Sequence, residues 1–194
     1  MEKRFSGNGT SWKIKSVIDL MDSGERLPRD FFIRDALDVA PEILGKFLVV
    51  RSAIGVLNRF AVTEAEAYRG SEDRACHAFK GRTPRTEIMF HKGGHLYIYL
   101  IYGMYWMLNI VTGEENNPQA ILIRGVENIS GPGKLTKSLG IDRSFYGEDV
   151  VISERIWFED SGVKPLYKTG PRIGVDYAGD IWKNKPWRYY TINK

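Results

Sequence analysis

The sequence predicts an α+β fold: one domain built on a mostly antiparallel sheet with helices beside it. The length of 194 residues suits a single domain, because a chain of this size can bury a core without disulfides or metals. Short apolar or alternating segments, separated by Gly, Pro and polar turns, recur along most of the chain. No internal repeat or linker divides it, so we expect one sheet and one core.

The N-terminal third predicts an extension, a helical region and two strands. Residues 1–27 are polar and weakly periodic, so we expect a mobile extension there and the domain over residues 28–194. From Asp30 onward apolar residues recur at helical spacing; Pro41 suggests a break or a second helix start, and Gly45 a helix end. LVVRSAIG and FAVTEAEAY follow as strands. The polar stretch RGSEDRACHAFKGRTPRT is expected to be a functional loop.

The aromatic segment from Leu96 to Val111 predicts a β-hairpin. It is shorter than the ~20 residues of a membrane-spanning helix. It also carries four tyrosines and is interrupted by Gly103. Glycine allows a tight turn, which we place at Tyr102 and Gly103. Beyond the hairpin, AILIRGVE predicts a strand, SGPGKLTKSLGI a turn feeding a helix, and the remainder short strands and turns.

Composition excludes several classes of protein. A content of 43% hydrophobic and 27% charged residues rules out low-complexity disorder. One cysteine excludes a disulfide framework and a multi-cysteine zinc site, and the three histidines lack a metal-binding spacing. No Walker A or dinucleotide-binding glycine motif occurs, so we expect no metal and no cofactor. The N-terminus lacks the apolar segment of a secretory signal, and the net charge of +4 permits an acidic partner such as nucleic acid.

Two carboxylates and a tyrosine share one face of the strand AVTEAEAY. Side chains alternate along a strand, so Glu64, Glu66 and Tyr68 point to one side and Ala65 and Ala67 to the other. One interpretation is a solvated face of the sheet. The other is a strand deep in the sheet, since small alanines allow close packing, and a carboxylate there requires a partner.

Arg124 and the hairpin tyrosines also allow two interpretations each. Arg124 ends a strongly apolar run: it lies either at the rim of the sheet or in a pair with Glu66 that keeps the carboxylate ionised and positions a water. Tyr97 and Tyr99 share one face of the hairpin. Tyr102 at the tip is either one exposed tyrosine or a wedge that enters a DNA groove and unstacks a base step.

Taken together, these segments resemble the alkyladenine (3-methyladenine) DNA glycosylase family. The motifs EAY, HAFKGRTPR and YIYLIYGMYWMLN, followed by AILIRGVE and SGPGKLTKSLGI, match in order from about Leu27 to Tyr190. The resemblance implies a compact domain with a curved sheet and a hairpin that inserts into DNA. It also implies a monofunctional glycosylase that flips alkylated or deaminated purines out of double-stranded DNA and hydrolyses the N-glycosidic bond in base excision repair. We therefore expect a monomer without membrane contact, in the cytoplasm or nucleoid of a bacterium or in a eukaryotic nucleus.

The same resemblance assigns catalytic residues. Glu66 occupies the place of the general base, which activates the water that attacks C1′ of the deoxyribose. Arg124 matches the arginine that helps to hold this water, and His77 contributes there through its backbone. No role maps onto Glu64, so Glu64→Gln is expected to leave turnover nearly unchanged.

The resemblance also assigns residues that hold the base and the DNA. Tyr68, His77 and Tyr99 sandwich the extruded base, and their electron-rich rings favour a cationic alkylated purine. Asn109 lies at the pocket floor and disfavours the amino group of guanine, while Tyr102 intercalates into the duplex.

Basic residues are expected to bind DNA phosphates. These are Arg82, Arg85 and Lys134, together with the C-terminal stretch KNKPWRYY. Two other functions remain open from the sequence: a nucleic-acid-binding protein that uses its tyrosines only for stacking, and a glycosidase that uses Glu64 and Glu66 as an acid–base pair.

Overall fold

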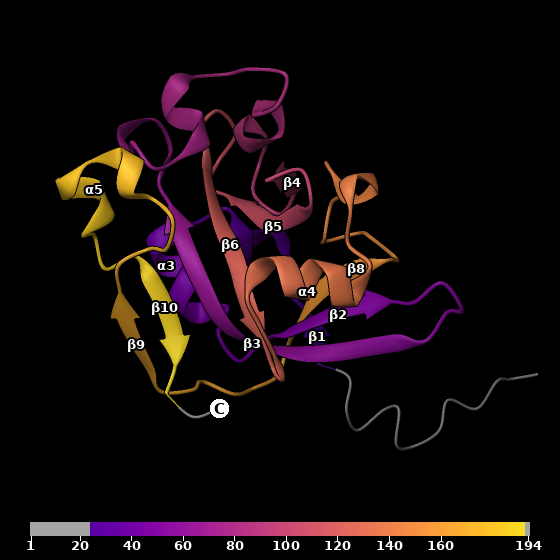
Figure 1. The fold of residues 1–194 in the computed structure, drawn as a ribbon. Coiled ribbons are helices and arrows are strands. Elements are labelled where there is room, and N and C mark those ends of the chain that lie inside the picture. Colours follow the sequence, from indigo (N-terminus) through magenta and orange to yellow (C-terminus); the bar gives the residue numbers. More distant parts are fainter. Residues whose placement is uncertain (1–23, 193–194) are drawn as a thin grey trace, which may run out of the picture.

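A sheet of ten strands forms the centre of the part of the chain that the computed structural model describes, residues 24–192 (Figure 1). The strands are Glu25–Arg26 (β1), Phe47–Arg51 (β2), Leu57–Tyr68 (β3), Leu96–Ile101 (β4), Tyr105–Thr112 (β5), Gln119–Val126 (β6), Ile129–Ser130 (β7), Ile156–Asp160 (β8), Tyr167–Gly170 (β9) and Arg188–Thr191 (β10). They pair in the order β1-β8-β2-β3-β6-β5-β4; β10 pairs with β3 and β9, and β7 with β6. All these pairings are antiparallel, which confirms the predicted α+β class.

Short helices lie around the sheet. The α-helices are Arg29–Phe32 (α2), Ala36–Glu42 (α3), Pro132–Leu139 (α4) and Asp180–Lys183 (α5); the 3-10 turns are Gly70–Glu72 (η1), His77–Lys80 (η2), Glu87–Phe90 (η3), Arg143–Phe145 (η4) and Asp176–Ala178 (η5). The predicted break at Pro41 is wrong. The chain breaks before α3, where the Asp35 carboxylate accepts a hydrogen bond from the Leu37 N–H at 2.9 Å and so starts a new helix. Pro41 lies inside α3, and Gly45 follows its end with φ +82°.

The sheet begins inside the segment that the sequence assigns to the N-terminal extension. Strand β1 pairs with β8, and the Leu27 N–H donates to the Phe158 carbonyl at 2.9 Å. The Leu27 side chain is buried. The described part of the predicted extension therefore belongs to the domain, and its remainder, residues 1–23, lies outside the described residues.

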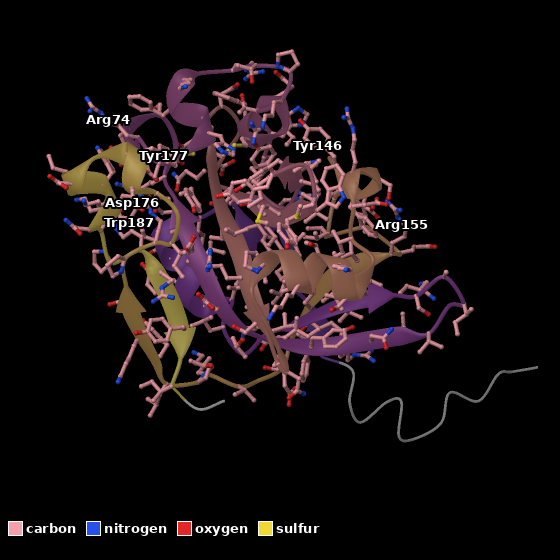
Figure 2. The ribbon with its side chains drawn as sticks, viewed as in Figure 1. Arg74, Tyr146, Arg155, Asp176, Tyr177 and Trp187 are labelled. Atoms are coloured by element: carbon pink, nitrogen blue, oxygen red, sulfur yellow. The ribbon has the colours of Figure 1, made fainter. Side chains whose placement is uncertain are left out.

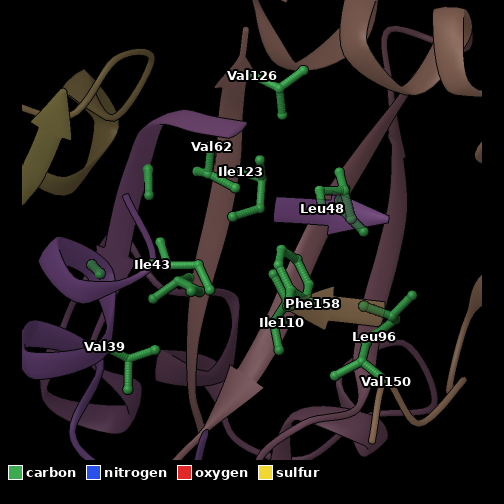
Figure 3. Close-up of a cluster of buried hydrophobic side chains, with 14 of the residues drawn as sticks. Val39, Ile43, Leu48, Val62, Leu96, Ile110, Ile123, Val126, Val150 and Phe158 are labelled. Carbon is green, nitrogen blue, oxygen red and sulfur yellow. The ribbon is translucent and has the colours of Figure 1, made fainter. Parts of the chain in front are cut away.

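The main core fills the space between one face of the sheet and α3 (Figure 3). Phe158 of β8, Ile110 of β5 and Ile123 of β6 are fully buried there. Ala65 and Ala67 of β3 are also fully buried on this face, where their small side chains leave room for α3. This confirms the interpretation of β3 as a strand deep in the sheet.

The opposite face of the sheet carries the polar and aromatic side chains that the sequence singles out. Alternate side chains of β3, β6, β5 and β4 pack into the apolar core on one face of the sheet. The side chains between them point to the opposite face. Strands β4 and β5 form the predicted hairpin, with Ile101 opposite Tyr105 at its end. Strand β10 lies against β3 (Figure 1), which brings C-terminal residues to the same neighbourhood.

Candidate active site

Glu66 is a buried carboxylate with three polar neighbours. Its Oε2 accepts a hydrogen bond from the Tyr68 hydroxyl at 2.9 Å, and its Oε1 accepts one from the Ile173 N–H at 2.8 Å. The Arg124 Nε lies 3.4 Å from Oε1. Burial raises the pKa of Glu66 above its usual value, while Arg124, Ile173 and Tyr68 act against this rise. Tyr68, Arg124 and Ile173 line a cavity, and the Glu66 side chain, 0% exposed, lies directly behind them.

Arg124 contacts two carboxylates rather than one. Its Nε donates to Glu64 Oε1 at 3.0 Å, a shorter contact than that to Glu66. The expected pair between Arg124 and Glu66 is therefore present, but the same guanidinium also pairs with Glu64. Arg124 lowers the pKa of Glu66 as expected, yet burial is the larger effect.

Aromatic side chains line the cavity, which has a volume of about 400 Å³. The structure places Tyr68, His77 and Tyr99 together on its wall, as the sequence predicts. The rings of His77 and Tyr99 are in edge contact, with centroids 4.6 Å apart. Tyr97 adds a further ring 5.2 Å from that of Tyr99. A cavity of this size, mostly apolar and with few polar groups, is typical of sites for small planar ligands.

His77 is a neutral imidazole in this environment. Burial, together with the positive charges of Arg85 and Lys80, lowers the pKa of His77 to about 4. Its Nδ1 is hydrogen-bonded to the Tyr97 hydroxyl at 2.8 Å. Burial also raises the pKa of Tyr97 to about 12, so this hydroxyl keeps its proton at neutral pH.

Asn109 is a buried residue that lines the cavity. Its Nδ2 donates to the backbone carbonyls of Tyr97 at 3.0 Å and Met107 at 3.3 Å. Because an amide nitrogen has two protons, both are used, and the carbonyl oxygen Oδ1 is the atom left to meet a ligand. Asn109 therefore presents an acceptor to the cavity.

Tyr102 lies at the tip of the β4–β5 hairpin and is 85% exposed. The turn is closed by a hydrogen bond from the Met104 N–H to the Ile101 carbonyl at 3.1 Å, and Tyr102 and Gly103 both have positive φ values. Tyr102 also borders the cavity. The predicted position of this tyrosine at an exposed tip is confirmed.

The three basic residues predicted to bind phosphates have different surroundings. Arg82 is paired with Glu87 at 2.8 Å and with Asn116 at 2.6 Å, so its guanidinium already has partners within the protein. Arg85 lies 5.1 Å from the centre of the Tyr99 ring, at the cavity. Lys134 is exposed on α4.

Sequence reasoning missed the segment that closes the cavity from the C-terminal side. Ile173 and Tyr177 both line the cavity, and the Tyr177 hydroxyl donates to the Ala75 carbonyl at 2.9 Å; Tyr177 is labelled in Figure 2. Arg172, next to Ile173, forms a fully buried ion pair with Asp73 at 2.5 Å. A short charged segment among turns gives no periodic signal, so only the fold shows that PRIGVDY reaches the site.

The described residues include no group of three or more His, Cys, Asp or Glu side chains that could hold a metal ion. The rings of His91 and His95 lie 5.5 Å apart, and Glu87 Oε1 lies 3.9 Å from His91 Nε2, but these side chains do not form such a group. Within residues 24–192, no helix is long and apolar enough to cross a membrane.

Chemically, the site joins an aromatic cavity to a buried carboxylate of raised pKa. The cavity can hold a flat, electron-poor ring by stacking and cation–π attraction. A carboxylate of raised pKa beside it can accept a proton from water or another weak acid near neutral pH. The arrangement is suited to hydrolysis of a bond to an aromatic leaving group.

Comparison with known proteins identifies the family. Residues 30–131 and 127–194 match the family described as methylpurine-DNA glycosylase (MPG). Relatives named "Putative 3-methyladenine DNA glycosylase" include one from Methanocella arvoryzae, 43% identical over 187 residues, with 86% of this chain and 92% of the relative covered. One from Rickettsia felis is 45% identical over 174 residues, covering 86% and 93%. One from Psychrobacter cryohalolentis is 40% identical over 193 residues, covering 80% and 91%.

These matches extend over nearly all of the domain, including every strand of the site. They make the protein a DNA glycosylase, a hydrolase that acts on N-glycosidic bonds in DNA repair. On this evidence, the chain belongs to the methylpurine-DNA glycosylase family.

Proposed function

We propose that this enzyme flips alkylated or deaminated purines out of duplex DNA and hydrolyses their N-glycosidic bond with a water activated by Glu66. The observation that carries the proposal is the position of Glu66. It is a fully buried carboxylate of raised pKa directly behind the wall of an aromatic cavity. A carboxylate is costly to bury, and its retention at such a place indicates a chemical role.

The aromatic rings would bind the flipped base on two sides. We expect His77 and Tyr99, whose rings are in edge contact, to hold the base together with Tyr68, which lines the same cavity. A neutral His77 adds no positive charge beside a cationic alkylated purine. The Asn109 carbonyl oxygen can accept a hydrogen bond from a purine donor and orient the base, so the discrimination against the guanine amino group that the resemblance implies would be steric and not the lack of an acceptor.

In the reaction, a water attacks C1′ of the deoxyribose while the bond from C1′ to the purine nitrogen breaks. The bonding electron pair leaves with the purine. This neutralises an alkylated, cationic base, whereas a neutral deaminated base also takes up a proton from water as it leaves. Glu66 accepts a proton from the water, and Arg124 helps to orient that water. Because Ile173 and Arg124 cover Glu66, water reaches the carboxylate only when one of them shifts. Ile173 is half exposed and is followed by Gly174 with φ +78° in open space, so it is the freer of the two.

The enzyme is monofunctional in this proposal. A glycosylase that also cleaves the strand uses an amine that forms a Schiff base with the sugar. No lysine is among the described residues that line the cavity. Water is therefore the nucleophile, and the product is an abasic site.

The test is single-turnover excision from a duplex with one 7-methylguanine or hypoxanthine, comparing wild type with Glu66→Gln. Glutamine keeps the shape of the side chain but cannot take the proton, so we expect a rate loss of about 10²–10⁴ with lesion binding retained. Glu25→Gln, on exposed β1, serves as the control with an unchanged rate. Quenching with borohydride should trap no protein–DNA adduct.

Excision by Glu66→Gln at nearly the wild-type rate would refute the mechanism. If the wild-type protein binds lesion DNA but releases no free base, the non-catalytic DNA-binding function is correct instead.

A further inference from the structure

Four charged side chains meet at one place on the sheet. Glu64 and Glu66 come from β3, Arg124 from β6 and Arg188 from β10. Glu64 Oε1 accepts from Arg124 Nε at 3.0 Å and lies 3.3 Å from Arg188 Nη1. Glu66 has only one of these arginines as an ion-pair partner, Arg124 at 3.4 Å. Glu64 is thus the residue that both guanidiniums contact.

The pairing of the strands explains this geometry. Strand β3 lies between β6 and β10, and Arg188 is the register partner of Glu66. The pairing of β3 with β6 shifts register on both sides of Glu64, where this residue stands opposite Gly125. Such an irregularity redirects the side chain. Its carboxylate reaches over to Arg124, one residue before Gly125.

We propose that Glu64 is a positioning residue for the reaction: it holds Arg124 between the two carboxylates, so that Arg124 is oriented toward the cavity without neutralising Glu66. The inference rests on the proposed role of Glu66 as general base. Glu64 itself is not among the residues that line the cavity, so it acts through Arg124.

The physical reason is competition for the guanidinium. Glu64 takes the shorter contact with Arg124 and adds a like charge near Glu66. Both effects keep the pKa of Glu66 raised, which a general base requires to accept a proton near neutral pH. With a neutral residue at position 64, Arg124 and Arg188 have Glu66 as the remaining carboxylate in the cluster. The pKa of Glu66 then falls, and it becomes a weaker base.

Several other groups also face Glu66. They are the hydroxyl of Tyr68, the N–H of Ile173, Tyr99 across the cavity and the buried pair of Arg172 with Asp73. A change at Glu64 leaves all of these contacts in place, so a shift in the titration of Glu66 reports on the arginines and on the lost charge.

The test is the pH dependence of single-turnover excision of 7-methylguanine, which is already cationic and needs no added proton. In wild type, the rate falls at low pH as Glu66 becomes protonated. In Glu64→Gln, we expect this acid limb to move to lower pH by about one unit. The plateau rate stays nearly unchanged, in contrast to the loss of ~10²-fold or more expected when the base itself is removed. Glu64→Asp keeps the charge and should return the limb toward wild type, and Glu25→Gln should not move it.

Each outcome separates the two proposals. If Glu66→Gln abolishes excision but Glu64→Gln has the wild-type limb, the role of Glu64 is wrong and that of Glu66 stands. The positioning role is also overturned if Glu64→Gln lowers the rate without moving the acid limb. The same holds if reduced thermal stability of this variant explains its lower rate. If Glu66→Gln remains active, the proposed function itself fails.

Discussion

At the scale of single residues, Arg172 connects the segment next to Glu66 to the rest of the molecule. Its guanidinium is fully buried, makes two hydrogen bonds to Asp73 at 2.5 and 2.9 Å, and donates to the Ala67 carbonyl at 2.9 Å. It lies between the rings of Tyr68 and Trp187, at 4.8 and 5.0 Å from their centres. The next residue, Ile173, donates to Glu66. The buried ion pair of Arg172 with Asp73 therefore holds the loop that covers Glu66.

Asp73→Asn should destabilise the protein strongly. It leaves the buried charge of Arg172 without its partner, which typically costs about 3–5 kcal/mol of the free energy of unfolding. Denaturant unfolding measures the loss. Glu42→Gln, which removes the exposed pair with Arg34 at 2.9 Å, should cost at most ~1 kcal/mol. Equal losses in the two variants would show that burial of the Arg172 pair has no special weight.

At the scale of elements, the β4–β5 hairpin carries a strained and exposed apolar tip. Tyr102 has φ +50°, a conformation uncommon for residues other than glycine. Tyr102 and Met104 are 85% and 65% exposed, so neither gains burial from the fold. Strain without compensating packing indicates that the tip is shaped for contact with another molecule. Its position beside the cavity supports the proposal that the tip inserts into the DNA duplex.

Tyr102→Ala should weaken binding to lesion DNA by the ~1–3 kcal/mol of a lost base–aromatic stack. The melting temperature should not fall, because the side chain makes little contact in the free protein. Titration of a lesion duplex measures the affinity. Ile54→Ala provides a matched control, since Ile54 is 86% exposed at the tip of the β2–β3 hairpin. Unaltered affinity of the folded Tyr102 variant would exclude the wedge role.

At the scale of the whole molecule, a net charge of +4 favours binding to the DNA backbone. The contribution of each basic residue to DNA binding depends on whether its charged group already has partners within the protein. Arg82 bridges Glu87 and Asn116 and braces the loop after η2, whereas Lys134 is exposed on α4. Only a cation free to approach a phosphate displaces a counterion from DNA.

Lys134→Ala should therefore lower the salt dependence of DNA binding. The slope of log K against log salt concentration should fall by about one, uniformly across sequences. Arg82→Ala should leave the slope unchanged, because its guanidinium is engaged within the protein. Binding titrations at several salt concentrations decide this. If both variants lower the slope equally, Arg82 leaves its partners to contact DNA.

The fold class, the strand at Glu66 and the hairpin with Tyr102 at its tip could all be predicted from the sequence. These features depend on side-chain alternation and turn residues, which are local properties of the chain. Helix boundaries were harder to predict from the sequence. The helix begins after the N-cap residue Asp35 and continues through Pro41, where the sequence predicts a break. The start of the sheet at β1 depends on pairing with the distant β8, so polar composition alone placed the boundary too late.

The contacts that complete the site depend on tertiary packing and could not be predicted from the sequence. Glu66 accepts a hydrogen bond from Ile173, 107 residues further along the chain, and Glu64 meets Arg188, 124 residues away. Sharing of Arg124 by two carboxylates follows from the strand order β10-β3-β6 and from a register shift at Glu64. Alternation tells which face a side chain occupies, but not which strand lies beside it or in what register. Those depend on the packing of the whole sheet.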